Sequence, residues 1–187
     1  MTDLDLPTFE PESISTERLT LRQWTAADRE PFARINADPE VMRHFPNPLT
    51  REQSDAMADI AERRIRHNGW GLWVVDLDGD FVGFTGFAVP SFDAPFTPAV
   101  EIGWRFARSA WGNGYATEAA RAALEVGFTR LGLKEVVSFT TVANAASRNV
   151  MNRLGMLRDP ADDFDHPRLP EDSPQRRHVL YRLGAPA

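Results

Sequence analysis

The sequence contains no cysteine. This absence excludes disulfide bonds, thiolate metal ligands and a cysteine nucleophile. It leaves the cellular compartment open but favours the reducing cytoplasm over an oxidising compartment, where disulfides form and persist.

The sequence also lacks an excess of positive charge and any long apolar run. Its formal net charge is -6, whereas nucleic-acid binding needs a basic surface that displaces counterions from phosphates. No apolar run approaches the roughly 18 residues of a membrane span, and the acidic start differs from the basic and then apolar start of a signal peptide. We therefore expect a soluble cytoplasmic protein with no nucleic-acid partner and no membrane partner.

The length of 187 residues suits one ordinary domain. Residues 1–15 combine acidic residues and prolines without a periodic pattern, so we expect a loosely ordered leader there. Residues 16–184 are expected to form the single domain. Within it, the proline-rich and charged stretch 158–177 predicts a long loop.

Alternating polar and apolar residues predict strands, and apolar residues at helical spacing predict helices. The Asp78-Gly79 pair predicts a tight hairpin; Thr50-Arg-Glu-Gln53 is a capping box, and Gly69 is expected to end the helix that it opens. The expected strands are 18–24, 70–76, 81–87, 99–107, 136–142 and 178–183, and the expected helices begin at Thr25 or Asp28, at Thr50, after Gly114 and at Asn144. This order predicts a mixed α/β (α+β) fold around one sheet.

The segment Val100–Ala119 is predicted to form a strand, a two-glycine turn and the start of a helix. Gly112 and Gly114 permit a close approach of the backbone to a ligand, and the first amides of the helix have no partner within it. A phosphate or pyrophosphate is the expected occupant. The turn lacks the Gly-Lys-Ser/Thr of a P-loop and the third glycine of a dinucleotide fingerprint, since Thr117 stands there. A tight turn that binds nothing is the alternative.

Three motifs follow one another in the sequence, namely Val100-Glu-Ile-Gly-Trp104, Trp111-Gly-Asn-Gly-Tyr-Ala-Thr-Glu-Ala119 and Asn144-Ala-Ala-Ser-Arg-Asn-Val-Met-Asn-Arg-Leu-Gly-Met156. As a set they resemble the GNAT superfamily of N-acetyltransferases, in particular its RimJ/RimL-like branch. The similarity covers about residues 16–184 in element order. It implies a mostly antiparallel central sheet of about six to seven strands, flanked by about four helices, with a splayed pair of parallel strands. It also implies acetyl-CoA as co-substrate and no metal.

The resemblance implies an acetyl-CoA site assembled from three segments. The turn after the strand 99–107 would bind the pyrophosphate through backbone amides, the exposed backbone of that strand would pair with the pantetheine, and the helix from Asn144 would lie near the sulfur. Ser109, with Arg108 beside it, replaces a Gln or Arg of the family pattern. The implied cofactor-binding residues are Ile102, Trp104, Phe106, Arg108, Ser109, Trp111, Gly112, Asn113, Gly114, Tyr115, Ala116, Asn144 and Ser147.

Acetyl transfer requires a neutral amine, whereas a lysine-like amine has a pKa of about 10.4, so a group must accept a proton. Glu101 is the candidate base, directly or through water; the alternative is an exposed strand glutamate beside Arg105. The resemblance implies that the amide near Trp104 stabilises charge on the thioester oxygen. It also implies that Ser147 hydrogen-bonds the leaving sulfur; the alternative is a serine that satisfies amides at the helix start.

The acceptor pocket is expected to be lined by His44, Phe45, Phe92 and Phe96, because aromatic loop residues suit a pocket wall, although such residues also pin their own loops. The expected partner is an amine-bearing small molecule or a peptide or protein N-terminus. The histidines show no metal-ligand spacing, so no metal site is predicted. His166 is interpreted as a surface residue, and the alternative is that it leans over the site from the late loop. We expect a monomer, or a homodimer that pairs through the last strand.

Together these features predict an N-acetyltransferase in which the amine attacks acetyl-CoA directly in a ternary complex, since no cysteine can carry the acetyl group. Two alternatives remain open. The first is a non-catalytic acyl-CoA-binding module with the same fold. The second is a nucleotide-binding protein, which would bind ATP or NAD without pantetheine.

Overall fold

The computed structural model describes residues 4–186, so the first three residues of the expected leader lie outside the described part. Its centre is an eight-stranded sheet with the strand order β1-β2-β3-β4-β5-β6-β8-β7. Neighbouring strands are antiparallel except β5 and β6, which are parallel. The strands are β1 (Ile14–Ser15), β2 (Thr20–Arg22), β3 (Leu72–Leu77), β4 (Asp80–Ala88), β5 (Glu101–Phe106), β6 (Glu135–Thr141), β7 (Phe164–Asp165) and β8 (Arg177–Gly184). The predicted fold class is confirmed, and the strand count exceeds the expected one because the two-residue β1 and β7 join the sheet edges.

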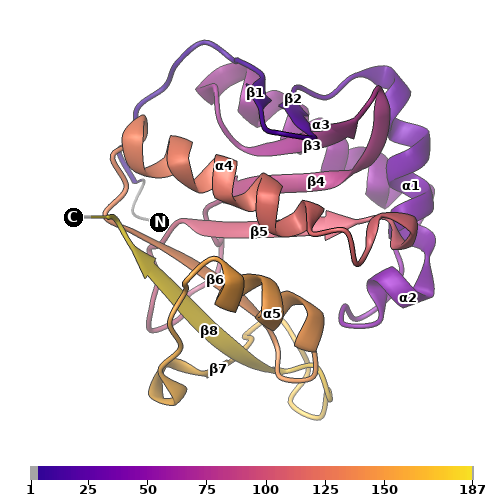
Figure 1. The fold of residues 1–187 in the computed structure, drawn as a ribbon. Helices are drawn as coiled ribbons and strands as arrows, with labels where there is room; N and C mark the ends of the chain where they lie inside the picture. The colour runs from indigo at the N-terminus through magenta and orange to yellow at the C-terminus, as the bar shows by residue number, and fades with distance from the viewer. Residues whose placement is uncertain (1–3, 187) are drawn as a thin grey trace.

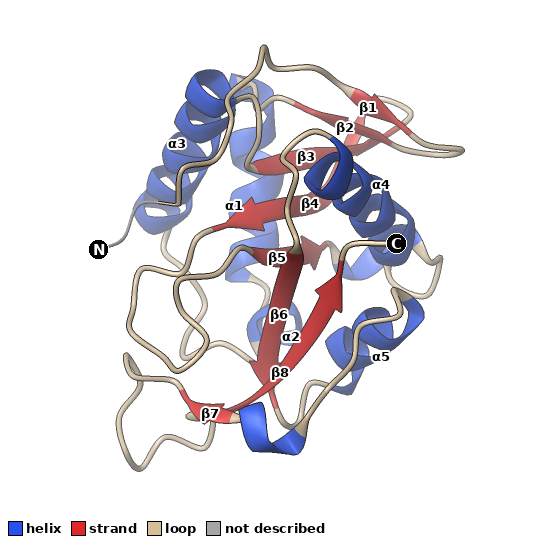
Figure 2. Ribbon diagram, turned by 90° about the vertical axis from the view of Figure 1, so that its left-hand side faces the viewer, coloured by secondary structure: helices blue, strands red, loops and turns tan. Residues whose placement is uncertain are grey.

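The helices lie on both faces of this sheet. α1 (Arg29–Ala37) and α3 (Arg51–Asn68) cover one face of its β2–β5 half, and α4 (Tyr115–Thr129) covers the other face (Figures 1 and 2). α5 (Ala145–Arg153) packs beside α4 and against β6, and the four-residue α2 (Pro39–Met42) follows α1. In the strand order, the parallel pair β5 and β6 joins the β1–β5 part of the sheet to the part formed by β6, β8 and β7.

Two local signals produce the structures that they predict. Asp78 and Gly79 have φ values of 54° and 93° and join β3 to β4, as a two-residue turn with positive φ at both positions requires. Thr50 accepts a hydrogen bond from Gln53 N at the start of α3, and Gly69 ends that helix with a φ of 79°. The predicted hairpin, capping box and helix end are confirmed.

The stretch 158–177, expected as a long loop, contains more structure than its composition indicates. Pro160–Asp162 form a 3₁₀ turn, and Phe164 of β7 pairs with His178 of β8. The loop prediction was wrong for these residues. A two-residue strand is too short to show a periodic pattern, and its pairing partner belongs to the distant last strand.

The described part of the expected leader packs onto the domain. Ile14–Ser15 pair with β2 as β1, and Phe9 N donates a 3.0 Å hydrogen bond to Asn68 O at the end of α3. The Phe9 ring also lies 4.0 Å from the Arg130 guanidinium. Strand pairing thus begins before Thr16.

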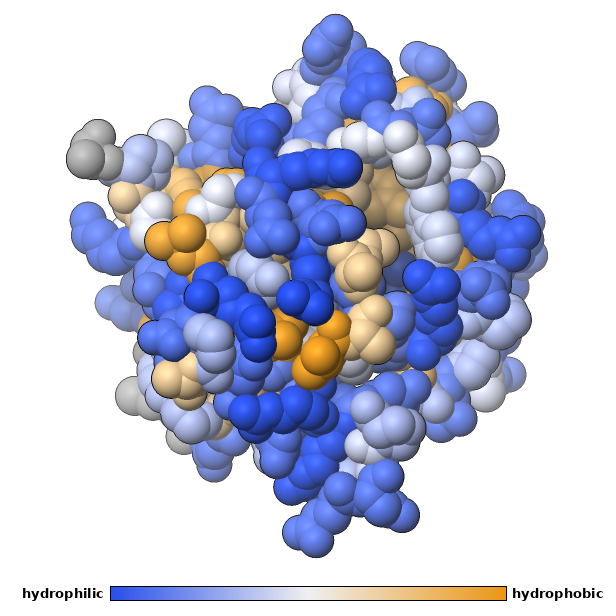
Figure 3. All heavy atoms as spheres, turned by 60° about the horizontal axis from the view of Figure 1, so that its bottom comes forward, coloured by the Kyte–Doolittle hydropathy of each residue, from blue (hydrophilic) through white to orange (hydrophobic). Residues whose placement is uncertain are grey.

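The main core lies between the sheet and its helices. Helix α4 approaches β4 closely because Gly127 has no side chain; a Cβ there would lie 2.6 Å from the Phe87 ring. The face shown in Figure 3 is mainly hydrophilic, and hydrophobic side chains gather there in small patches. Among the described helices, none combines the length and apolar character needed to cross a membrane.

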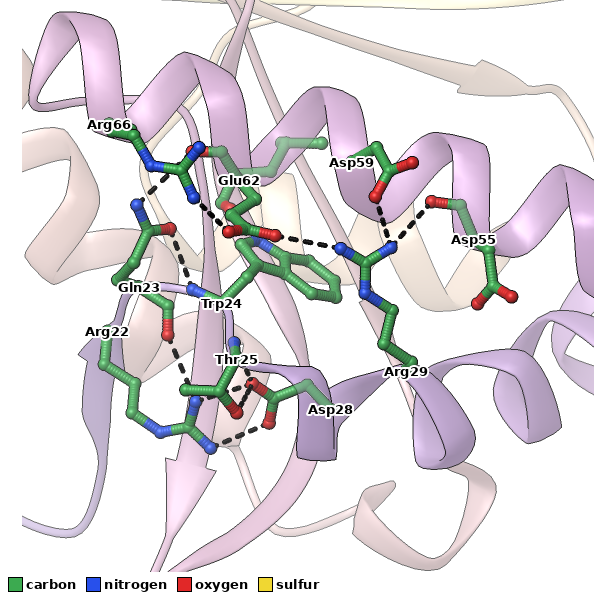
Figure 4. Close-up of polar contacts among 11 residues, drawn as sticks. Arg22, Gln23, Trp24, Thr25, Asp28, Arg29, Asp55, Asp59, Glu62 and Arg66 are labelled. Atoms are coloured by element: carbon green, nitrogen blue, oxygen red, sulfur yellow. Dashed lines mark hydrogen bonds and ion pairs between the residues drawn. The ribbon is translucent and has the colours of Figure 1, made fainter.

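A polar network holds α1 and α3 to the start of the sheet (Figure 4). Arg29 on α1 pairs with Asp59 at 2.5 Å and with Glu62 at 2.8 Å, both on α3. Arg22 donates two 2.9 Å hydrogen bonds to the buried carboxylate of Asp28, which directly precedes α1. These contacts fix α1, and therefore the segment after it, relative to β5.

Candidate active site

The parallel strands β5 and β6 separate soon after they meet. Within residues 4–186 they pair in register at Glu101 and Val137 alone, where Val137 N donates a 2.9 Å hydrogen bond to Val100 O. Because peptide groups alternate direction along a strand, Ile102, Trp104 and Phe106 direct theirs toward the opening gap. The Phe106 carbonyl accepts a 3.0 Å hydrogen bond from the Trp111 indole. The gap thus presents unpaired strand backbone around Ile102 and Trp104.

A cavity of about 670 Å³ occupies this gap. Its walls come from β5, the glycine turn, β6, the first turn of α5 and the segment after α2. Residues predicted for the site that line it are Trp104, Phe106, Trp111, Gly112, Gly114, Tyr115, Ala116, Asn144, Ser147, Glu101, His44 and Phe45. The structure therefore brings together residues that the sequence separates by as many as 103 positions, from His44 to Ser147.

The glycine turn presents a row of free amides. Backbone carbonyls accept hydrogen bonds from the N–H groups on either side of it, those of Ala110, Trp111, Thr117 and Glu118. The N–H groups of residues 112–116 make no such bond within the described chain. Gly112 and Gly114 have φ values of 80° and 82°, and the space beside Gly112 is open. The row ends at the positive end of α4, an arrangement that suits a phosphate or pyrophosphate.

Two side chains brace this turn from behind. Arg18 donates to Asn113 O at 3.0 Å and forms a bidentate pair with Glu118 on α4, at 2.8 and 2.6 Å. Asn113 itself donates to the carbonyls of Ala110 and Trp111. Asn113 therefore holds the shape of the turn and does not line the cavity.

Arg108 and Ser109 also lie away from the cavity. They belong to a 3₁₀ turn, Arg108–Ala110, and line a small depression against α1. Neither residue lines the cavity. The backbone amides of the turn are the groups of the predicted pyrophosphate site that face it. Ile102 likewise has a fully buried side chain and can contribute through its backbone alone.

Asn144 and Ser147 form a closed local pair. Asn144 caps α5 by accepting from Ser147 N at 3.2 Å, and its Nδ2 donates to Thr140 Oγ1 at 2.8 Å and to Ser147 Oγ at 3.2 Å. The Asn144 amide is thus occupied, while Ser147 Oγ accepts a hydrogen bond and keeps its own proton free to donate. Ser147 lines the cavity with this free donor.

Glu101 lies at the start of β5, on the face that it shares with Gly103 and Arg105. Its carboxylate is 3.9 Å from the position that a Cβ at Gly103 would occupy. It forms no ion pair with Arg105 within the described residues, and burial raises the pKa of Glu101 to about 8. The carboxyl is therefore a proton acceptor in the weakly alkaline range.

The opposite wall of the cavity contains three histidines. His44 Nδ1 lies 3.3 Å from Thr141 Oγ1, and the rings of His166 and His178 are 5.1 Å apart. Burial is the main cause that lowers the pKa of all three, so they are neutral at pH 7. His166 lines the cavity and is not simply a surface residue, and His178 was not predicted because its strand pattern resembles that of any buried strand.

Phe92 and Phe96 do not line the cavity, in contrast to Phe45. They pack with Phe139 and Phe164 in an aromatic cluster, with ring separations of 4.8 to 6.3 Å. Phe92 reaches the cavity wall indirectly, since its ring lies 4.6 Å from that of His166. The loop aromatics thus stabilise the loop against β6, the alternative that the sequence left open.

No group of three or more His, Cys, Asp or Glu side chains suitable for a metal ion occurs in the described part of the chain. The cavity instead combines a row of backbone amides, one carboxyl with a raised pKa and one free hydroxyl proton. This set can bind a polyanion at one end and exchange protons at the other.

Comparison with known proteins gives the same family throughout. Residues 18–157 match the family model described as the acetyltransferase (GNAT) domain. The chain is 34% identical over 77% of its length to FsC-acetyl coenzyme A-N(2)-transacetylase of Aspergillus fumigatus, and the match spans 64% of that fungal protein.

Solved structures agree with this similarity. An acetyltransferase from Agrobacterium tumefaciens superposes with a TM-score of 0.74 at 27% identity, with 98% of each chain covered. Mycobacterium smegmatis RimJ, solved in complex with a CoA-disulfide, superposes with the same TM-score of 0.74 at 22% identity over 94% of this chain and 88% of its own. The similarity to RimJ is one of fold.

Proposed function

Because this chain belongs to the acetyltransferase (GNAT) family of N-acetyltransferases, we propose that it transfers acetyl from acetyl-CoA to a primary amine. The acceptor is the amine of a small molecule or of a peptide or protein N-terminus, and it attacks directly in a ternary complex. The observation that carries the proposal is the row of free amides at residues 112–116, because four of these residues (Gly112, Gly114, Tyr115 and Ala116) line the same cavity as Glu101 and Ser147.

Different segments of this chain would bind different parts of acetyl-CoA. The amides of residues 112–116 would hold the pyrophosphate, and the free backbone of β5 near Trp104 would pair with the pantetheine and donate to the thioester oxygen. Acetyl-CoA supplies the activated acyl group. Asn144 contributes by orienting Ser147, because its own amide is already bonded to Thr140 and Ser147.

Two proton transfers complete the reaction. The carboxylate form of Glu101 would take a proton from the acceptor ammonium, which leaves a neutral amine with a free electron pair. Attack then forms the C–N bond and breaks the C–S bond, and the second proton of the amine nitrogen passes to the leaving sulfur to give CoA thiol. Ser147 would assist by donating a hydrogen bond from its hydroxyl to that sulfur. With a pKa of about 8, the carboxyl of Glu101 is matched to this task at a weakly alkaline pH.

The relatives support an amine acceptor. The fungal relative is named for transfer of acetyl from acetyl coenzyme A to an N(2) atom, and two of the similar folds belong to RimJ and to RimL, named as a ribosomal L7/L12 alpha-N-protein acetyltransferase. Their names point to different acceptors, so the family alone does not select one for this chain.

The first test separates the acetyltransferase from its alternatives. Calorimetric titration with acetyl-CoA, ATP and NAD should give micromolar binding of acetyl-CoA and far weaker binding of the nucleotides. Tight binding of ATP or NAD without binding of acetyl-CoA would instead support a nucleotide-binding protein. Release of CoA thiol from acetyl-CoA with an amine library then distinguishes an enzyme from a non-catalytic acyl-CoA-binding module.

The second test addresses Glu101. In the native protein, kcat/KM should rise with pH through about 8, whereas Glu101→Gln should lose this rise, keep its affinity for acetyl-CoA and turn over about 100-fold more slowly. Glu171→Gln, a change at an exposed position outside the cavity, is the matched control. An unchanged pH profile in Glu101→Gln would remove Glu101 from the mechanism.

A further inference from the structure

Arg105 is a buried cation without a counterion. Its side chain arises from β5 on the face of Glu101 and lines the cavity, and only 9% of the residue is exposed. Within the described residues, no carboxylate lies within ion-pair distance of its guanidinium. By contrast, Arg22 of β2 pairs with two carboxylates.

The contacts of Arg105 leave one edge of the guanidinium without a hydrogen-bond partner. Nη1 donates to Asn36 Oδ1 on α1, and Asn36 Nδ2 in turn donates to Ser54 Oγ on α3 at 2.8 Å. The rings of Phe45 and Phe84 lie 4.3 and 5.5 Å from the guanidinium carbon. Nε is buried and has no hydrogen-bond partner in the described chain. The free edge is therefore the one formed by Nε and Nη2.

Such an arrangement is costly unless a ligand completes it. Burial of an unpaired charge and of an unsatisfied N–H group both disfavour folding, and burial lowers the pKa of Arg105 to about 10, which still leaves it charged at pH 7. The Nε and Nη2 edge of an arginine matches the two oxygens of a carboxylate. The neutral Asn36 side chain and the two aromatic rings hold the guanidinium in place without neutralising its charge.

We propose that Arg105 binds a carboxylate of the acceptor, so that the acceptor is an amine that also carries a carboxylate group. This inference rests on the proposed function, because it assigns the second end of the molecule whose amine meets Glu101. A carboxylate balances the single charge of Arg105, whereas a phosphate dianion would leave a negative charge in the cavity.

The spacing along β5 adds a constraint on length. Glu101 and Arg105 are four residues apart, so their Cα atoms are about 13 Å apart along a strand. Gly103 lies between them on the same face and contributes no side chain, which leaves room for a substrate. The Glu101 carboxyl leans toward Gly103, so the span that the acceptor bridges is shorter than this Cα separation. The amine and the carboxylate should therefore lie on different carbons of the acceptor.

The test uses pairs of acceptors that differ in one charge. Straight-chain ω-amino acids of increasing length and their primary amides are assayed with acetyl-CoA by release of CoA thiol. The native enzyme should prefer at least one amino acid over its amide by about tenfold or more in kcat/KM. If amines are acetylated and no pair differs, the carboxylate proposal fails while the acetyltransferase stands. If none of these pairs is acetylated but another amine of the library is, the carboxylate proposal fails and the acetyltransferase stands; if no amine of the library is acetylated, both fail.

Two variants decide whether Arg105 causes the preference. Asn36→Asp places a carboxylate on the atom that already accepts from Arg105 Nη1, so it should neutralise the guanidinium internally and reduce the amino acid to amide ratio to within about threefold of one. Arg105→Met, which keeps an apolar chain between the two rings, should have the same effect. Arg34→Met, an exposed arginine on the same helix as Asn36, should retain the native ratio. A ratio that persists in Asn36→Asp overturns the proposal, even if Arg105→Met does not fold.

Discussion

Replacement of Glu101 by glutamine should stabilise the protein, and more so as the pH rises. Burial raises the pKa of this carboxyl from 4.5 to about 8, so the folded state prefers its protonated form. The stability associated with this proton is fully present below pH 4.5 and is lost as the pH rises through about 8. Glutamine imitates the protonated form at every pH and should avoid the loss.

The magnitude follows from the two pKa values. Linkage gives a cost of about 1 kcal/mol at pH 5 and about 3 kcal/mol at pH 7 for a fully buried carboxyl with these values. Glu101 is partly exposed to the cavity, where solvent screens its charge, so we reduce both figures by about half. The advantage of Glu101→Gln should therefore grow by about 1 kcal/mol or more between pH 5 and pH 7.

Urea unfolding followed by circular dichroism at pH 5, 6, 7 and 8 measures this growth. Glu171→Gln, at an exposed position, should follow the native curve at every pH. Parallel curves for the native protein and Glu101→Gln would refute the reasoning, because they would mean that the Glu101 carboxyl titrates alike in the folded and unfolded chain. The same result would weaken the assignment of Glu101 as a base near pH 8.

Three further predictions test other parts of the structure. Ser147→Ala should lower kcat about tenfold with little change in acetyl-CoA affinity in calorimetry, because it removes the free donor beside the sulfur. Gly112→Ala should weaken acetyl-CoA binding about tenfold in the same assay, because its φ of 80° disfavours a side chain and the open space beside it belongs to the ligand. Asp28→Asn should lower the free energy of unfolding by about 2 to 3 kcal/mol in urea at pH 7, because it breaks the buried pair with Arg22, whereas Glu30→Gln on the exposed face of α1 should cost less than about 0.5 kcal/mol. Burial tends to raise the pKa of Asp28, but hydrogen bonds from Arg22 and Thr25 outweigh it and lower the pKa, so the loss in Asp28→Asn should diminish as the pH falls below about 4.

The fold was predictable where a short segment determines its own geometry. The Asp78-Gly79 turn, the Thr50 capping box and the left-handed Gly69 depend on neighbours within a few residues, and each was found as predicted. Segments whose structure depends on distant partners were missed. α2 was missed for another reason: it begins with a local signal, Asp38 accepting from Glu40 N and Pro39 at the first helical position, which can also mark a simple break.

The two ends of the cavity also differed in how far the sequence could predict them. The cofactor end depends on a continuous turn whose glycines and helix start are adjacent in sequence, so its amides could be anticipated from residues 112–116 alone. The acceptor end is assembled from α2 and the segment after it, β5, β6 and β8. Phe92 and Phe96 were assigned to it as loop aromatics, but an aromatic loop residue fits a buried cluster as well as a pocket wall, and only the fold distinguishes the two.

Arg105 shows why the acceptor end could not be reached from the sequence. The alternation of β5 places Arg105 on the face of Glu101, yet its meaning depends on Asn36, 69 positions away. An aspartate at position 36 would make Arg105 half of a structural ion pair, with no need for a ligand. An asparagine holds the same guanidinium through a neutral carbonyl oxygen and leaves the charge of Arg105 unbalanced. One amide in place of one carboxylate therefore separates a structural arginine from a binding one, and Asn36→Asp reverses that difference with the smallest change that the chain offers.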